Sequence, residues 1–304
     1  MTVVDWLLDS DPSIRWQVMR DLTGEPAEAV AAERARVATE GWGARLLDRQ
    51  AEDGKWGEVS YTRYIDTPDG QSTHALILLR DMGLDPGSAQ ARLAVARARD
   101  NVTHWEGSQP FFAGEVEACI NGRVLTLGAY FGEANEALLA RLLAEQLDDG
   151  GWNCEAPPSV RSSFHSTICV LEGLLAYEQA RGATAALTEA RVRGQEYLLG
   201  RHMFRSSSSG QVIDPAWTLF SFPCGYHYDV LRGLDYLRSA GVEPDERIAE
   251  AIELVAQNRG ADERWPLQNP HGDLLDLDME AADEPSRWNT LRALRVLHWA
   301  GRGG

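Results

Sequence analysis

The sequence predicts an all-α protein whose helices form two concentric layers. Three observations support this fold class. Strand patterns are nearly absent, buried helical segments alternate with amphipathic ones, and a Gln-x-x-x-Gly-x-Trp pattern recurs between them. The 304 residues are enough for one large domain, and we expect a single domain over residues 1–304.

Six segments are predicted to be inner helices, because apolar or small residues occupy most of their faces at helical spacing. They cover residues 13–22, 72–83, 117–131, 163–178, 226–239 and 285–299. More polar segments, rich in Ala, Arg, Glu and Leu, are predicted to be outer helices at 27–49, 87–99, 134–147, 184–200 and 244–258. Such a set nearly completes a closed double ring, and an open solenoid is the alternative. Neither end has the polar cap that is usual in a solenoid, which favours the ring.

Two connections from an outer to an inner helix carry the same pattern. They read Gln50-Ala-Glu-Asp-Gly-Lys-Trp56 and Gln146-Leu-Asp-Asp-Gly-Gly-Trp152. The Gly allows a left-handed turn after a helix, the Gln amide can bond carbonyls at a helix end, and the Trp anchors the turn in apolar surroundings. A third connection over residues 259–265 keeps the Trp but lacks the Gln and the Gly.

These joints resemble the QW motifs of squalene-hopene cyclases and the related repeats of protein prenyltransferase β subunits. The whole chain is also similar to prokaryotic proteins labelled squalene cyclase-like or prenyltransferase-like. The resemblance implies a single α/α toroid around a central cavity, and an enzyme acting on an isoprenoid or another largely apolar small molecule. The Asp-x-Asp-Asp acid of triterpene cyclases is absent, so we do not expect squalene cyclisation itself.

Two consecutive inner helix starts carry residues that ligate metals. Prenyltransferase β subunits hold zinc with Asp-x-Cys at one inner helix and His at the next, and the resemblance places Glu117, Cys119 and His165 in these roles. Lanthipeptide cyclases use two Cys and one His, which adds Cys154 to the predicted set. Zinc suits thiolate and imidazole ligands. The alternative is that the cysteines are small buried hydrophobes and that His165 caps its helix.

Acid–base candidates lie further along the chain. His227 and Asp229 are predicted to be catalytic, because a His beside a carboxylate can move protons near neutral pH. Asp276 and Asp278, followed by Glu280, alternate so that neighbouring carboxylates could raise one pKa, as an acid requires. The alternatives are a capping or cavity-lining role for His227 and a solvated acidic loop around Asp278.

The starts of the inner helices are expected to face one opening of the cavity. Helix N-termini favour anions, so an acidic substrate group is expected to bind there. The residues assigned to cavity lining and substrate binding are Trp16, His74, Tyr226, Trp288 and Asn289.

Composition limits the partners. The formal net charge of −17 would repel a phosphate backbone, so we expect no nucleic acid partner. The sequence has no apolar run that could span a membrane and no secretory signal, which together with four unpaired-looking cysteines predicts a cytoplasmic protein.

Four function classes remain open at this level: an isoprenoid-type enzyme, a zinc enzyme that activates a thiol or water, a carbohydrate-active double-ring enzyme and a noncatalytic binding module. An enzyme is favoured, and zinc is the one cofactor indicated. The partner is expected to be a small-molecule substrate, and the oligomeric state is left open.

Overall fold

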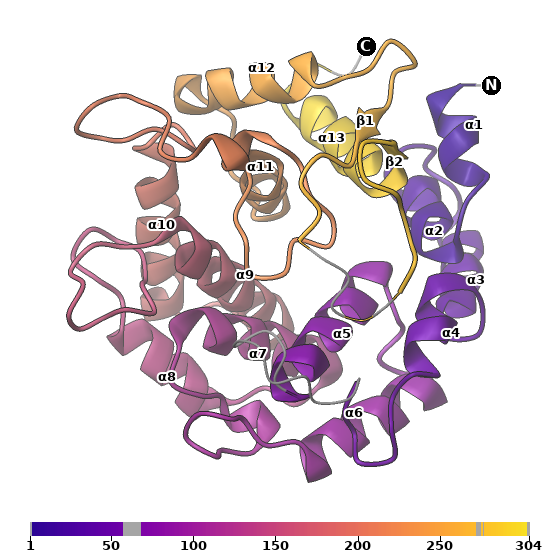
Figure 1. Cartoon of the computed structure of the whole chain (residues 1–304), viewed down its shortest axis with the longest axis horizontal. Coiled ribbons are helices and arrows are strands. Elements are labelled where there is room, and N and C mark those ends of the chain that lie inside the picture. Colours follow the sequence, from indigo (N-terminus) through magenta and orange to yellow (C-terminus); the bar gives the residue numbers. More distant parts are fainter. Residues whose placement is uncertain (1, 57–67, 272–274, 276, 303–304) are drawn as a thin grey trace. The chain divides into compact units, whose positions relative to one another are not determined.

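The computed structural model describes residues 2–56, 68–271, 275 and 277–302, and it is mostly helical (Figure 1). Within these residues the only sheet is a short antiparallel pair, β1 (Trp265–Pro266) and β2 (Pro285–Ser286). The predicted all-α class is therefore confirmed. No helix in the described part of the chain is long and apolar enough to cross a bilayer.

The chain divides into two compact units. The first comprises Met1–Glu33, Gln195–Gly272 and Asp278–Gly304. Its last helix, α13 (Arg287–Trp299), packs against α2 (Pro12–Asp21), α11 (Val230–Ser239), α12 (Ala249–Gln257) and both β1 and β2. Leu291, Ala293 and Val296 of α13 are fully buried, so this helix is central to the core of the unit. A short helix, α1 (Val3–Leu8), packs on α2.

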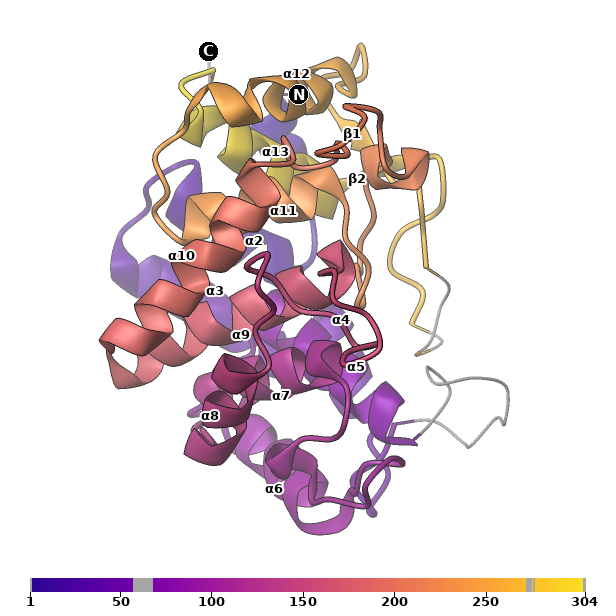
Figure 2. The same ribbon diagram turned by 90° about the vertical axis from the view of Figure 1, so that its left-hand side faces the viewer.

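The second unit comprises Arg34–Gly194 and Asp273–Leu277. Its most intimate contact joins α7 (Ala118–Phe131) and α9 (Phe164–Arg181), which lie side by side (Figure 1, Figure 2). A Cβ on Gly122 would lie 2.5 Å from the main chain of Cys169, and one on Gly173 would lie 2.4 Å from the carbonyl oxygen of Gly122. Glycine at both positions therefore lets the two helices meet backbone to backbone.

The remaining elements agree with most of the predicted boundaries. The predicted buried helices correspond to α2, α5, α7, α9, α11 and α13, where α5 spans Pro68–Met82. The other helices are α3 (Ala27–Ala35), α4 (Gly41–Leu47), α6 (Ala89–Asn101), α8 (Glu136–Ala144) and α10 (Ala185–Leu199). Short 3₁₀ turns are η1 (Arg36–Ala38), η2 (Phe111–Ala113), η3 (Pro215–Thr218) and η4 (Glu246–Ile248). The division between the units falls inside α3 and α10, and the single toroidal domain over 1–304 remains a prediction.

Two predicted helices are wrong in detail. The segment 27–49 is not continuous, because it breaks into α3, η1 and α4, with Gly41 at a φ of 66°. The helix expected from residue 226 begins only at Val230, because the side chain of Asp229 caps it. Tyr226 and His227 therefore lie in the preceding loop.

The two repeated joints have the same hydrogen bonds, both within the second unit. Trp56 Nε1 donates to the Leu46 carbonyl at 2.8 Å, and Trp152 Nε1 donates to the Leu142 carbonyl at 2.7 Å. The amide of each Gln spans two carbonyls, one in its own turn and one in the next helix: Gln50 reaches Gly54 and Ala94, and Gln146 reaches Gly150 and Ala190. The pattern is thus a staple between a helix end and its neighbour.

The third joint, in the first unit, keeps the Trp geometry without the Gln and Gly. Trp265 Nε1 donates to the Val255 carbonyl at 2.7 Å, and the ring is fully buried. Glu263 takes the left-handed conformation, with φ 67°, two residues before the Trp, where the other joints have glycine. The Trp contact therefore survives although a non-glycine residue occupies the strained position.

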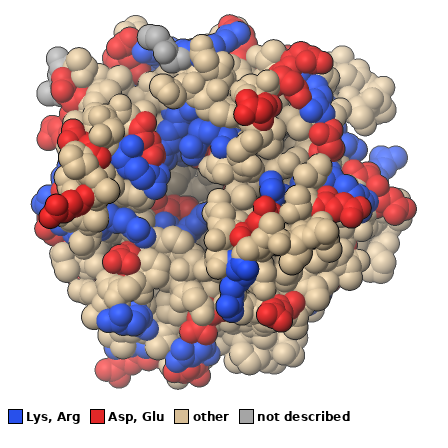
Figure 3. Space-filling model, turned by 180° about the vertical axis from the view of Figure 1, so that it is seen from behind, with Lys and Arg blue, Asp and Glu red and all other residues tan. Residues whose placement is uncertain are grey.

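Charged groups are mixed on the surface. Figure 3 shows acidic and basic side chains interspersed over the face it presents. Many of them pair, as Arg36 does with Glu40 at 2.6 Å and Arg259 with Glu263 at 2.8 Å. Exposed pairs of this kind each contribute about 1 kcal/mol or less.

Candidate metal centre

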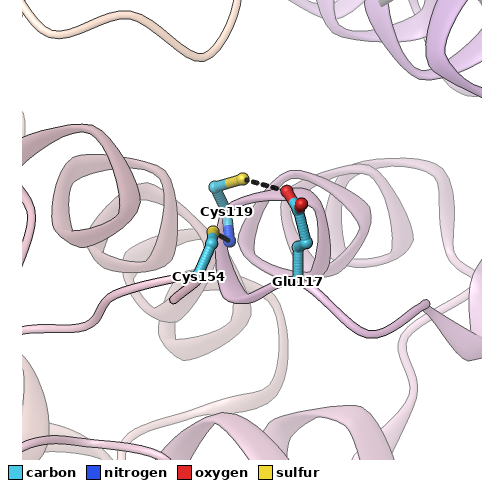
Figure 4. Close-up of side chains that lie close together, drawn as sticks. All are labelled: Glu117, Cys119 and Cys154. Carbon is cyan, nitrogen blue, oxygen red and sulfur yellow. Dashed lines mark hydrogen bonds between the residues drawn. The ribbon is translucent and has the colours of Figure 1, made fainter. Parts of the chain in front are cut away.

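A cluster of two thiols and one carboxylate lies at the start of α7 (Figure 4). The Sγ atoms of Cys119 and Cys154 and a carboxylate oxygen of Glu117 all lie within 4.8 Å of one another. The Cys119 thiol is 3.4 Å from Glu117 Oε2, and Cys154 Sγ is 3.3 Å from the backbone nitrogen of Cys119. Three of the four predicted ligands are thus close together, although residue 154 is distant in sequence.

The start of α7 uses its polar groups in an unusual way. Glu117 occupies the N-cap position, but its side chain makes no capping hydrogen bond. Its carboxylate accepts instead from the Cys119 thiol, and the free amide of Cys119 donates to the sulfur of Cys154. A sulfur from another segment therefore occupies the place that a capping oxygen normally takes. As a result, the Glu117 carboxylate and the sulfurs of Cys119 and Cys154 lie close together.

Cys154 is held there by the second joint. Its loop follows Trp152, whose carbonyl accepts from the Ser163 amide at 2.8 Å and whose amide donates to Thr167 Oγ1 at 3.0 Å. The loop is thereby closed against the first turn of α9. In that turn, Ser166 Oγ lies 3.2 Å from Cys154 Sγ and accepts from the Cys154 amide at 3.3 Å.

The two thiols differ in acidity. Hydrogen bonding from the Cys119 side chain, and further bonds from Ser166 and the Cys119 amide, lower the pKa of Cys154 although burial opposes this. The side-chain hydrogen bond with Cys154, together with burial, raises the pKa of Cys119 well above its usual range. Cys154 is therefore the sulfur that carries negative charge most readily.

His165 does not join the cluster. It is the second residue of α9 and is half-buried, but its ring nitrogens are not within the 4.8 Å group. The neighbouring Ser166, which is not among the predicted ligands, contacts Cys154 from α9. In the sequence, the position of Ser166 directly after His165 is the one feature that points to a role at this site.

The donor set fits a divalent metal. Two thiols and one carboxylate are donors that zinc takes up, and three protein ligands leave one coordination position open. Because thiols bind as thiolates, metal binding at this cluster would release protons. Among the described residues, no other group of His, Cys, Asp and Glu side chains has ligand atoms gathered in this way.

The predicted acid–base pair lies at the start of α11, in the first unit. Asp229 is buried, and its carboxylate accepts from the Arg232 amide at 2.7 Å and from Ser221 Oγ at 2.8 Å. The thiol of Cys224 donates to the Ser221 carbonyl at 3.2 Å. Burial raises the pKa of Cys224 to about 11. The Asp229 carboxylate thus holds the helix start together.

Aromatic rings are stacked beside this helix start. His227 lies between Tyr226 and His271, with ring centroids 4.0 and 3.7 Å apart. His271 was not singled out from the sequence, and its burial lowers its pKa. Trp288 is buried and stacks on Phe222 at 4.0 Å.

The remaining residues predicted to line the cavity or bind substrate are all buried. Trp16 is buried under the guanidinium of Arg20 at 4.7 Å, and His74 is buried with its Nδ1 3.5 Å from Arg123. Asn289 is fully buried, and its amide nitrogen donates to the carbonyls of Phe220 and Pro266.

The predicted acidic group is only partly described. Asp276 lies outside the described residues, and Asp278 is exposed. Glu280 accepts from the Arg287 amide at 2.6 Å and from Ser286 Oγ at 2.5 Å, and its burial raises its pKa.

Comparisons with known proteins give similar folds at low identity. No protein family matches the sequence, and no curated protein matches it. A protein from Actinoplanes shares 17% identity at a TM-score of 0.48, over 98% of this chain and 97% of that one. The type II terpene cyclase MstE from Scytonema shares 18% identity at a TM-score of 0.48, over 95% of this chain and 87% of that one.

A variant of MstE in complex with geranylgeranyl dihydroxybenzoate, its substrate, shares 17% identity at a TM-score of 0.46, over 96% of this chain and 87% of that one. At this level of similarity neither protein carries a conclusion about the activity of this chain.

Proposed function

We propose that this chain is a zinc enzyme whose metal is held by Glu117, Cys119 and Cys154. The observation that carries the proposal is the convergence of their three ligand atoms within 4.8 Å at the start of α7. Zinc held by these residues would supply the charge that lowers the pKa of a substrate thiol or a water, so that either could act as a nucleophile near neutral pH.

The chain's own residues have separate tasks in this proposal. Cys154 supplies the thiolate that forms first, since the Cys119 amide and Ser166 already stabilise charge on its sulfur. Glu117 lies 3.4 Å from the Cys119 sulfur, so its carboxylate is placed to bind the same metal ion as this sulfur. Ser166 orients Cys154 from outside the ligand set, as outer partners of metal ligands usually do.

The substrate class is the one that the sequence resemblance predicts, an isoprenoid or another largely apolar small molecule. This substrate class can be tested by incubating the zinc-loaded protein with isoprenoid alcohols and diphosphates, with and without a thiol acceptor. The products are then analysed by mass spectrometry. An oligosaccharide series forms a second arm. Turnover of an isoprenoid that is lost in Cys119→Ser supports the proposed substrate, whereas turnover confined to sugars contradicts it.

The metal itself is tested by cobalt substitution. Cobalt(II) bound by two thiolates gives an intense sulfur-to-metal absorption band, so the full chain titrated with cobalt should develop this band. Cys119→Ser and Cys154→Ser should each weaken it strongly, and Cys224→Ser should leave it unchanged. Because His165 lies outside the cluster, His165→Ala should keep the band. A band that persists in both Cys119→Ser and Cys154→Ser would refute the ligand assignment.

A further inference from the structure

The same two sulfurs form a pair with a second chemistry. Cys119 and Cys154 are both free thiols, their Sγ atoms lie within 4.8 Å, and no disulfide joins them. The backbone nitrogen of Cys119 is itself only 3.3 Å from Cys154 Sγ. Since the Cys154 sulfur already reaches the backbone of Cys119, rotation of the side chains is the main change that an S–S bond requires.

We propose that Cys154 is a site of oxidation by a hydroperoxide and that Cys119 is the thiol that resolves it to a disulfide. Cys154 is the attacking sulfur because the Cys119 amide and Ser166 Oγ both lie within hydrogen-bond distance of it. Cys154 is also the more exposed of the two residues, since it is half-buried whereas Cys119 is buried.

The chemistry balances in two steps. The Cys154 thiolate attacks one peroxide oxygen, the O–O bond breaks, and the other oxygen leaves as an alcohol or water after taking a proton, which leaves Cys154 as a sulfenic acid. The Cys119 sulfur then attacks the sulfenic sulfur, the S–S bond forms, and the S–O bond breaks with release of water. Glu117, 3.4 Å from the Cys119 sulfur, is placed to accept the thiol proton. Overall, two thiols and a hydroperoxide give a disulfide, an alcohol and water.

The other two cysteines provide internal controls. Cys169 is fully buried in α9, where the main chain of α7 packs against it. The Cys224 thiol donates to the Ser221 carbonyl and lies 3.8 Å from the Asp229 carboxylate, which disfavours a thiolate there. Neither lies in the group formed by Glu117, Cys119 and Cys154, so neither is expected to resolve Cys154.

This proposal does not require the metal, although the two chemistries exclude one another. A disulfide has no thiolate to offer, so the oxidised chain should bind no zinc, and bound zinc should slow the oxidation. Metal binding by the reduced chain and disulfide formation by the metal-free chain are measured separately. The zinc proposal can therefore fail while the oxidation proposal stands, and the oxidation proposal can fail while the zinc proposal stands.

The test uses the full chain, reduced, freed of metal by a chelator and treated with about one equivalent of hydrogen peroxide. Intact mass should fall by about 2 Da, and peptide mapping should join residues 119 and 154. Cys119→Ser should instead stop at a sulfenic acid on Cys154, which dimedone traps. Cys154→Ser should oxidise at least about tenfold more slowly, and Cys224→Ser should behave as the parent.

Thermal melting of each variant shows that it is folded, and Cys119→Ala repeats the resolving test with a second side chain. A disulfide that joins any other pair of cysteines would overturn the proposal. So would a parent chain that gains oxygen without forming a disulfide, or Cys154→Ser oxidising at Cys119 at the parental rate.

Discussion

The starts of α7 and α11 contain the same residue types and use them in opposite ways. Each has a carboxylate at the N-cap position and a cysteine within five residues of it. At α11 the carboxylate of Asp229 caps the helix and binds Ser221, and the Cys224 thiol donates to a main-chain carbonyl. At α7 the carboxylate of Glu117 makes no cap and faces a thiol.

The difference separates a structural site from a candidate reactive one. Around Asp229 the carboxylate is used by donors of its own helix start and loop. Around Cys119 the backbone amide is satisfied by a sulfur from a distant loop, which brings a second thiol to the carboxylate. A carboxylate that caps no helix and has two free thiols beside it is available to a metal or an oxidant. The predictions below test this contrast.

The largest expected effect is on stability at α11. Asp229→Ala removes a buried carboxylate and leaves the Ser221 hydroxyl and the Arg232 amide without their acceptor, so the free energy of unfolding should fall by about 1–3 kcal/mol for each of these two groups. Glu117→Ala is the matched variant at α7 and should cost about 0.5 kcal/mol or less, because Glu117 makes no cap. Chemical denaturation of both variants gives the two values. Equal losses would show that the two carboxylates have the same role.

The next effect is on thiol reactivity. The pKa of Cys154 is lowered, whereas that of Cys224 is raised to about 11 by burial. Below both pKa values the thiolate fraction rises with pH, and Cys154 holds the larger fraction at every pH in that range. Near pH 7.5, iodoacetamide should therefore modify Cys154 roughly 100-fold faster than Cys224, as followed by peptide mapping.

The pH profile sharpens the same comparison. Modification of Cys154 should level off at a lower pH than modification of Cys224, which should still be rising near pH 10. A Cys224 rate that reaches its plateau first would reverse the assignment of the structural and reactive thiols.

The smallest effect concerns Ser166. Ser166→Ala removes one hydrogen bond to the Cys154 sulfur, worth about 1 kcal/mol, so the alkylation profile of Cys154 should move upward by roughly 0.7 pH units. The fold should be retained, since the change removes a single hydroxyl. Ser162→Ala offers a matched change outside the cluster, because its hydroxyl binds Asp149 instead. An unchanged profile in Ser166→Ala would show that Ser166 does not tune this sulfur.

Much of the fold is predictable from the sequence because helices and the joints between them depend on local sequence patterns. Helical periodicity marks α7 and α9 to within a few residues, and two copies of one pattern mark the joints. The third joint shows the limit of pattern matching. Glu263 has the left-handed backbone conformation that the pattern leads us to expect only of glycine. Trp265 nevertheless donates its indole N–H to a helix carbonyl, as in the other two joints.

The site was predictable only in part. Glu117 and Cys119 are two residues apart on one helix start, so their approach follows from local geometry. Cys154 comes from a loop 35 residues beyond Cys119, so it reaches them only through the tertiary fold. His165 was included by resemblance, but a position one residue from Ser166 on a helix points about 100° away. The stack of His227 on His271 joins segments far apart in sequence, which no local pattern encodes.

The central claim is that the Glu117, Cys119 and Cys154 cluster holds zinc. The most direct measurement is the zinc content of reduced full-length chain, purified without chelator or a metal-affinity tag and then titrated with zinc. We expect about one equivalent for the parent and for Cys224→Ser, and less than about a tenth for Cys119→Ser and Cys154→Ser. Less than about a tenth of an equivalent in the parent, with no uptake on titration, would contradict the claim.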